Sequence, residues 1–160
     1  MGRGRRTKPP AWAHVEGGNG HFVQLYDSML EHPAWKDLAP QAQALYLYCV
    51  RNSHGQATRD DAKRTGGRGD VRLFYMSHND AVAFGLYSAT DFRGLPRDLD
   101  ALISHGFIDM IWSGQASRAR NIYRLSGRWR SWGTPAFEMP LKYMSSRMKK
   151  AVEEVSEHVA

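Results

Sequence analysis

The sequence predicts an α+β fold in which short helices come before a β-hairpin. One observation is an amphipathic pattern from Ser88 to Gly106, and the other is a pair of apolar runs behind it that a polar turn separates. In the amphipathic segment the apolar residues follow the spacing of one buried helix face: Phe92, Leu95, Leu99, Leu102 and Ile103. The opposite face is expected to carry Thr90, Arg93, Gly94, Arg97, Ala101 and Ser104.

The hairpin is expected directly after this helix. Gly106 supplies a left-handed stop for the helix, and the apolar run Phe107–Trp112 then predicts a strand. The polar residues Ser113–Ser117 are typical of a turn, and Asn121–Leu125 has the composition of a returning strand. Behind the hairpin, two tryptophans are expected to close the edge of the core: Trp129 and Trp132.

The N-terminal half predicts shorter elements and one regular helix. Phe22–Leu25 predicts a strand, and either Asp27 or Ser28 is expected to cap a helical turn. The regular helix covers Leu38–Asn52, and Pro40 suits its first turn because a proline there removes no helical hydrogen bond. Its expected buried residues are Ala44, Leu45, Leu47, Tyr48 and Val50. Packing rather than chemistry is expected for Tyr46, Tyr48 and Cys49.

Two elements precede the amphipathic segment. Leu73–Met76 predicts a strand, and Ser77 is expected to cap a short helix through Phe84 that ends at Gly85. Helix, tight turn, helix and hairpin is the element order of a winged helix-turn-helix. Pro96 leaves two alternatives open: the second helix bends there, or Ser88 to Leu95 is a separate short helix and the recognition helix begins near Pro96.

A resemblance to a known group of proteins agrees with this order. The step from His105 to Ile108, followed by a hairpin, resembles the junction between recognition helix and wing in bacterial and phage winged-helix proteins. Over residues 21–132 the chain is similar to small winged-helix proteins of plasmids, phages and integrated elements, several of them related to replication initiators. The resemblance implies a DNA-binding winged helix domain, which we place at residues 21–134.

Composition favours a polyanionic partner. The chain has 160 residues, enough for one domain, and its net charge is +6. Its single cysteine, Cys49, excludes an internal disulfide and suits a reducing cytosol. No run approaches the roughly 18 apolar residues of a membrane span, so we expect a cytoplasmic, nucleoid-associated protein without a membrane partner.

Three polar or amphipathic segments surround or interrupt the domain. Residues 1–20 form a basic arm that either follows DNA or serves only as a solubilising terminus. The segment 54–72 is expected to be an exposed loop, either an extra DNA contact or a tolerated insertion. Residues 135–160 predict an amphipathic C-terminal helix. Its apolar stripe over residues 141–159 is expected either to pack on its own domain or to form a homodimer.

The candidate DNA-binding residues fall in three groups. Arginine reads guanine through two parallel hydrogen bonds, and hydroxyl groups near a helix start bind phosphate. The recognition-helix candidates are Ser88, Thr90, Arg93 and Arg97. The wing candidates are Arg118, Arg120 and Arg124, within a run of arginines that continues to Arg128 and Arg130. The arm candidates are Arg3, Arg5 and Arg6. Alternatively, the recognition-helix arginines lie on a solvated face with local ion pairs, and the basic hairpin has no partner.

No enzymatic reading finds support in local motifs. The histidines have no metal-ligand spacing on a helix, and Gly66–Gly69 lacks the ending of a phosphate-binding loop. We therefore expect no catalytic residue, no metal, no cofactor and no small-molecule substrate. The expected function is non-catalytic binding of double-stranded DNA, as a transcriptional regulator or as a replication accessory or initiator protein of a bacterial mobile element. The alternative is a winged-helix module that binds a protein or RNA, which the acidic residues Asp91, Asp98 and Asp100 favour.

Overall fold

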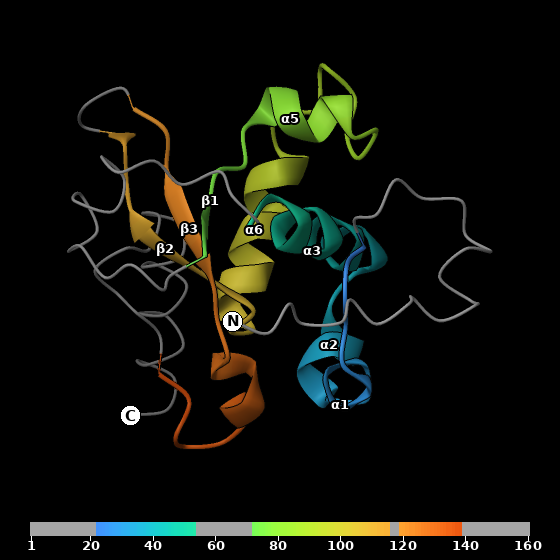
Figure 1. The fold of residues 1–160 in the computed structure, drawn as a ribbon, viewed down its shortest axis with the longest axis vertical. Helices are drawn as coiled ribbons and strands as arrows, with labels where there is room; N and C mark the ends of the chain where they lie inside the picture. The colour runs from blue at the N-terminus through green and yellow to red at the C-terminus, as the bar shows by residue number, and fades with distance from the viewer. Residues whose placement is uncertain (1–21, 54–71, 116–118, 139–160) are drawn as a thin grey trace, which may run out of the picture.

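The computed structural model describes residues 22–53, 72–115 and 119–138, which form an α+β fold (Figure 1). The helices are α1 (Asp27–Leu30), α2 (Pro33–Asp37), α3 (Pro40–Asn52), α5 (His78–Ala83), α6 (Gly94–Ser104) and the 3₁₀ helix η3 (Arg128–Ser131). The strands are β1 (Leu73–Phe74), β2 (Ile108–Trp112) and β3 (Ile122–Leu125). No helix in the described part of the chain is long and apolar enough to cross a membrane.

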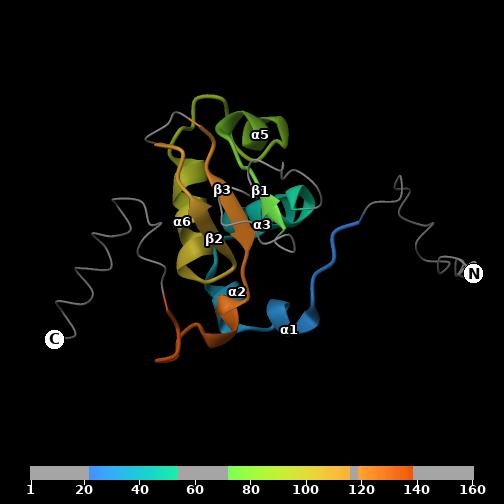
Figure 2. The same ribbon diagram turned by 60° about the vertical axis from the view of Figure 1, so that its left-hand side comes forward.

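The three strands form one antiparallel sheet with the order β1-β3-β2. The hairpin β2–β3 pairs Met110 with Tyr123, and β1 joins the other side of β3 by pairing Leu73 with Arg124. The sheet lies beside α3 and α6, and the start of α6 lies at the same end of the molecule as α5 and the turn end of the hairpin (Figures 1 and 2). One end of the fold therefore gathers the α5–α6 connection and the hairpin turn.

An aromatic cluster forms the core at the opposite end. The ring of Phe107, which is fully buried, meets Trp35 and Tyr46 edge to face and stacks on Trp129 at a centroid distance of 5.9 Å. Trp129 is buried and Trp132 packs against the core from its edge, so the predicted role of the two tryptophans is confirmed. This cluster joins α2, α3 and η3 to the turn after α6.

Helix α3 forms where it was predicted, but it buries a partly different set of residues. Pro40 occupies the first position, as expected. The buried residues are Ala42, Leu45, Tyr46, Cys49, Val50 and Asn52. Of the predicted set, Leu45 and Val50 are buried, Ala44 and Tyr48 are only half-buried, and the expected burial of Leu47 is wrong. Leu47 is 38% exposed because a helix that buries Leu45 and Cys49 turns it away from the core. Burial raises the pKa of the Cys49 thiol, which agrees with the expected packing role.

The predicted helix before the hairpin begins later than expected. Residues 88–93 form turns, and α6 starts at Gly94 with Pro96 in its first turn, where a proline removes no helical hydrogen bond. Of the two alternatives, a start near Pro96 is therefore right, but no separate helix precedes it. Phe92 lies outside the helix and is 69% exposed, and Gly94 is buried, so both face assignments are wrong. Gly106 ends the helix with φ of +81°, as predicted.

The capping of α5 is confirmed in detail. The Ser77 hydroxyl accepts a hydrogen bond from the Asp80 amide, and the Asp80 carboxylate accepts one from the Ser77 amide. Gly85 then breaks the helix with φ of +77°.

The predicted strand Phe22–Leu25 is wrong: this segment pairs with no described strand, and Phe22 is 75% exposed. The expected cap at Asp27 or Ser28 is also wrong, because Tyr26 is the N-cap of α1.

Several predictions concern parts of the chain outside the described residues. These are the arm with Arg3, Arg5 and Arg6, the loop over residues 54–71, the turn residue Arg118, and the amphipathic stripe of residues 141–159.

Candidate nucleic-acid interface

The start of α6 brings together the four residues predicted for the recognition helix. Ser88 and Thr90 lie in the exposed turn that leads into α6, and their hydroxyl oxygens are 3.3 Å apart. Arg93 is the N-cap residue of the helix and is exposed. Arg97 lies one turn further on, and 64% of its side chain is exposed. The start of α6 lies at the same end of the fold as the facing ends of strands β2 and β3 (Figure 2).

Asp91 explains why α6 begins where it does. Its carboxylate accepts hydrogen bonds from the backbone amides of Arg93 (3.2 Å) and Gly94 (2.9 Å). These amides belong to the first turn, where helical N–H groups have no partner within the helix. A negative charge at this end also complements the helix dipole. Asp91 is thus committed to the helix start, which the sequence pattern alone did not reveal.

Asp98 is the second acidic residue with a structural role. It is 2% exposed, and its carboxylate accepts hydrogen bonds from the Tyr87 hydroxyl (2.7 Å) and from Nε (2.9 Å) and Nη2 (3.2 Å) of Arg97. The hydrogen bond from Arg97 to Asp98 raises the pKa of Arg97. Desolvation, with a smaller contribution from Asp98, raises the pKa of Tyr87. The Asp98 carboxylate is therefore buried behind the exposed Arg97 guanidinium, whereas Asp91 is exposed and Asp100 is half-buried.

Gly94 is the residue that lets Tyr87 reach Asp98. A Cβ atom at Gly94 would lie 2.6 Å from the Tyr87 ring and 2.5 Å from the Asp91 carboxylate. No real Cβ tolerates such distances, so a larger residue here would displace the ring, the carboxylate or the helix start. Gly94 was predicted as a surface residue, but its role is this close approach.

The hairpin arginines differ in how much of their charge is available. Arg120 is exposed and lies over the Tyr75 ring at 5.4 Å. Arg124 is 45% exposed at its side chain and donates a hydrogen bond from Nη2 to Asp109 at 3.1 Å. Arg130 is exposed and lies over the Trp129 ring at 4.6 Å.

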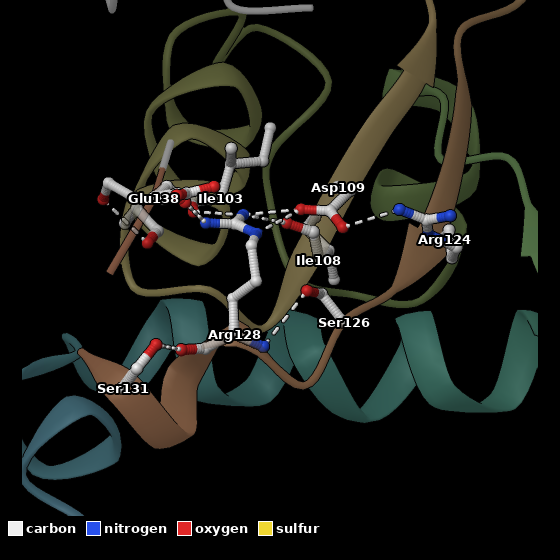
Figure 3. Close-up of polar contacts among 10 residues, drawn as sticks. Ile103, Ile108, Asp109, Arg124, Ser126, Arg128, Ser131 and Glu138 are labelled. Atoms are coloured by element: carbon white, nitrogen blue, oxygen red, sulfur yellow. Dashed lines mark hydrogen bonds and ion pairs between the residues drawn. The ribbon is translucent and has the colours of Figure 1, made fainter. Parts of the chain in front are cut away.

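Arg128 is a structural residue that the sequence grouped with the basic hairpin (Figure 3). Its Nε donates to the Asp109 carboxylate at 2.8 Å, and Asp109 is 5% exposed. Its terminal nitrogens donate to three backbone carbonyls, those of Ile103 (3.0 Å), Ile108 (3.3 Å) and Glu138 (2.9 Å). With only 21% of the side chain exposed, Arg128 joins the end of α6 to β2 and η3. It has little remaining capacity to bind a phosphate.

His78 lies beside the candidate surface, and His105 lies at the other end of α6. His78 stacks under the exposed Phe92 ring at 4.7 Å, and its Nε2 lies 3.2 Å from the Ala89 carbonyl oxygen. His105 is the C-cap of α6, with Nδ1 2.7 Å from the Ala101 carbonyl oxygen. The helical periodicity of the sequence predicted that Phe92 is buried. Phe92 is exposed next to Arg93 because Asp91 makes the helix begin later.

Comparison with known proteins adds no relative: no family model, no curated protein and no solved structure matches the chain significantly.

Proposed function

We propose that this chain is a winged helix-turn-helix protein that binds double-stranded DNA without catalysis. The observation that carries the proposal is the element order α3, β1, α5, α6, β2, β3, with β3 between the other two strands. In this assignment α5 and α6 are the helix-turn-helix, α6 is the recognition helix, and the β2–β3 hairpin is the wing. The charge of +6 supports a polyanionic ligand.

The proposed mechanism places the exposed face of α6 in the major groove. This groove admits an α-helix, and an arginine fork matches the two acceptors of guanine. Arg93 and Arg97 supply this fork from the exposed start of α6. Ser88 and Thr90 bind the neighbouring phosphate, and Arg120 with the exposed part of Arg124 neutralises phosphates beside the groove.

The proposed cellular role is that of a transcriptional regulator or of an accessory or initiator protein in the replication of a bacterial mobile element. This role rests on the resemblance of the sequence to winged-helix proteins of such elements, and it places the protein in the cytoplasm on the nucleoid. A homodimer through residues 141–159 would let two copies read two half-sites.

The second candidate function is binding of a protein or RNA partner. Two observations favour it: Phe92 is exposed beside Arg93, and Asp109 takes up charge from both Arg124 and Arg128. Fewer available cations fit a protein surface better than a phosphate backbone, and an exposed aromatic ring can pack on a protein or stack on an unpaired RNA base.

Paired substitution tests the proposed recognition helix. Replacing Arg93 and Arg97 together by Ala is expected to flatten sequence preference on a library of randomised duplexes, because both guanine-reading forks are lost. The matched control is Lys36→Ala with Arg130→Ala, two exposed cations in α2 and η3 at the opposite end of the molecule from α5 (Figure 1). If both double variants keep the sequence preference of the wild type, α6 does not read the bases.

A further inference from the structure

The buried carboxylate of Asp98 sits behind an exposed arginine. Asp98 is 2% exposed, and a carboxylate at such a position is retained only when it is paired and hydrogen-bonded. Asp98 has two hydrogen-bond partners among the described residues. The Tyr87 hydroxyl donates to Oδ2, and Arg97 donates to both carboxylate oxygens. Tyr87, Asp98 and Arg97 therefore form one continuous chain of contacts from the interior to the surface.

The geometry fixes which edge of Arg97 faces Asp98. The contacts use Nε and Nη2, so one edge of the planar guanidinium lies against the carboxylate. A guanidinium has a second edge, formed by Nη1 and Nη2, that carries the donors for a further bidentate contact. Since 64% of the side chain remains exposed with the carboxylate contacts made, a ligand can still reach Arg97 from solvent.

Arg93 provides a contrast on the same surface. Its backbone amide bonds to Asp91, but within the described residues its side chain has no ion pair. A long side chain that moves freely must lose rotamer entropy when it binds, whereas a side chain already fixed by a carboxylate loses less. The two arginines thus differ in preorganisation although they are one turn apart.

We propose that Tyr87 and Asp98 are positioning residues that hold Arg97 for bidentate reading of one guanine in duplex DNA. This inference rests on the proposed DNA binding and names Arg97 as the guanine-reading arginine that the fold holds in place. Guanine offers O6 and N7 as two acceptors in the major groove, and the Nη1–Nη2 edge matches them in spacing and direction. Arg93, the other guanine-reading candidate, has no carboxylate partner of this kind among the described residues.

The test uses the full chain and compares three variants on a library of randomised duplexes. Arg97→Lys keeps the charge and removes the fork, so it is expected to lose about tenfold to a hundredfold of discrimination at one G·C pair while affinity for unrelated duplex persists. Tyr87→Phe keeps the ring beside Gly94 and removes the hydroxyl, so it is expected to weaken discrimination at the same base pair by a smaller factor. Arg130→Lys, at an exposed arginine in η3, is the matched control and is expected to leave that base pair unchanged.

A double variant separates positioning from a purely structural role. If Tyr87 acts through Arg97, then Tyr87→Phe has no further effect on base discrimination once Arg97→Lys is present. Arg97 is exposed, so Arg97→Lys tests the proposal even if Tyr87→Phe lowers the melting temperature.

The outcomes distinguish the inference from the function on which it rests. If Arg97→Lys and Tyr87→Phe leave the sequence preference unchanged, the positioning role is overturned but duplex binding stands. The same holds if the wild type binds duplex DNA without any sequence preference. Absence of duplex binding by the wild type would overturn both the proposed function and the inference.

Discussion

Replacing Arg128 by Met is expected to destabilise the fold strongly. The change leaves the Asp109 carboxylate, which is 5% exposed, with Arg124 as its remaining described partner. It also removes one donor to each of the carbonyls of Ile103 and Ile108, although the Ile103 carbonyl still accepts from the Gly106 amide. Breaking a buried ion pair from one side costs about 3–5 kcal/mol because an uncompensated charge stays buried. Because Asp109 keeps its ion pair with Arg124, we place the expected loss at the lower end, about 3 kcal/mol.

A loss of this size is a large part of the stability of a domain, which is about 5–15 kcal/mol. The melting temperature is expected to fall by about 10 °C or more. Urea denaturation and calorimetry measure both quantities. The control is Arg130→Met, which removes an exposed guanidinium over the Trp129 ring and is expected to cost about 1 kcal/mol or less.

A second variant identifies the cause of the loss. Asp109→Leu combined with Arg128→Met removes the buried charge together with its partner, so it is expected to be more stable than Arg128→Met alone. A loss below about 1 kcal/mol in Arg128→Met would refute the assigned role, since a surface arginine costs no more than that. A double variant no more stable than the single one would show that the buried charge is not the cause.

Three further predictions address the helix start, the core and the hairpin. Gly94→Ala is expected to cost about 1–3 kcal/mol, because the new methyl group would lie 2.6 Å from an aromatic ring; an unchanged urea midpoint would contradict this. Burial raises the pKa of Tyr46 and Tyr123 to about 12 from 10.0, so the unfolded chain releases these protons first. Stability is therefore expected to be complete below pH 10 and to fall as pH rises toward about 12, and a free energy of unfolding that stays constant over this range would contradict the burial. Replacing Arg118 and Arg120 by Ala should weaken binding to all duplexes and reduce the salt slope by about 2, whereas an unaltered slope would place the hairpin away from the phosphates.

Local signals in the sequence predicted the hairpin and some of the helix ends, but not the starts of α1 and α6. The two strands, the cap at Ser77 and the left-handed glycines Gly85 and Gly106 all follow from turn and capping chemistry within a few residues. The same holds for Pro40 at the start of α3. Such features need no knowledge of distant contacts, which is why the sequence alone was sufficient.

Features that depend on tertiary contacts were not predictable. Asp109 and Arg128 are far apart in sequence, and their ion pair exists only because η3 folds back against β2. Tyr87 and Asp98 meet only because Gly94 leaves room for the ring. Neither contact leaves a periodic pattern, so the sequence grouped Arg128 with the available cations.

The position of Phe92 was missed for a different reason. Its spacing from Leu95 and Leu99 fits a helix face, but the carboxylate of Asp91 accepts from the amides of the next turn and starts the helix at Gly94. A competing local hydrogen bond therefore overrode the hydrophobic period.

Binding of a fluorescent random duplex, followed by anisotropy during a salt titration, tests duplex recognition most directly. We expect binding at low salt and an affinity that falls as salt rises, with a slope equivalent to several released counterions. A single strand of the same length is expected to bind more weakly, because its backbone presents no major groove to α6. Absence of duplex binding at low salt would contradict DNA recognition and favour a protein or RNA partner.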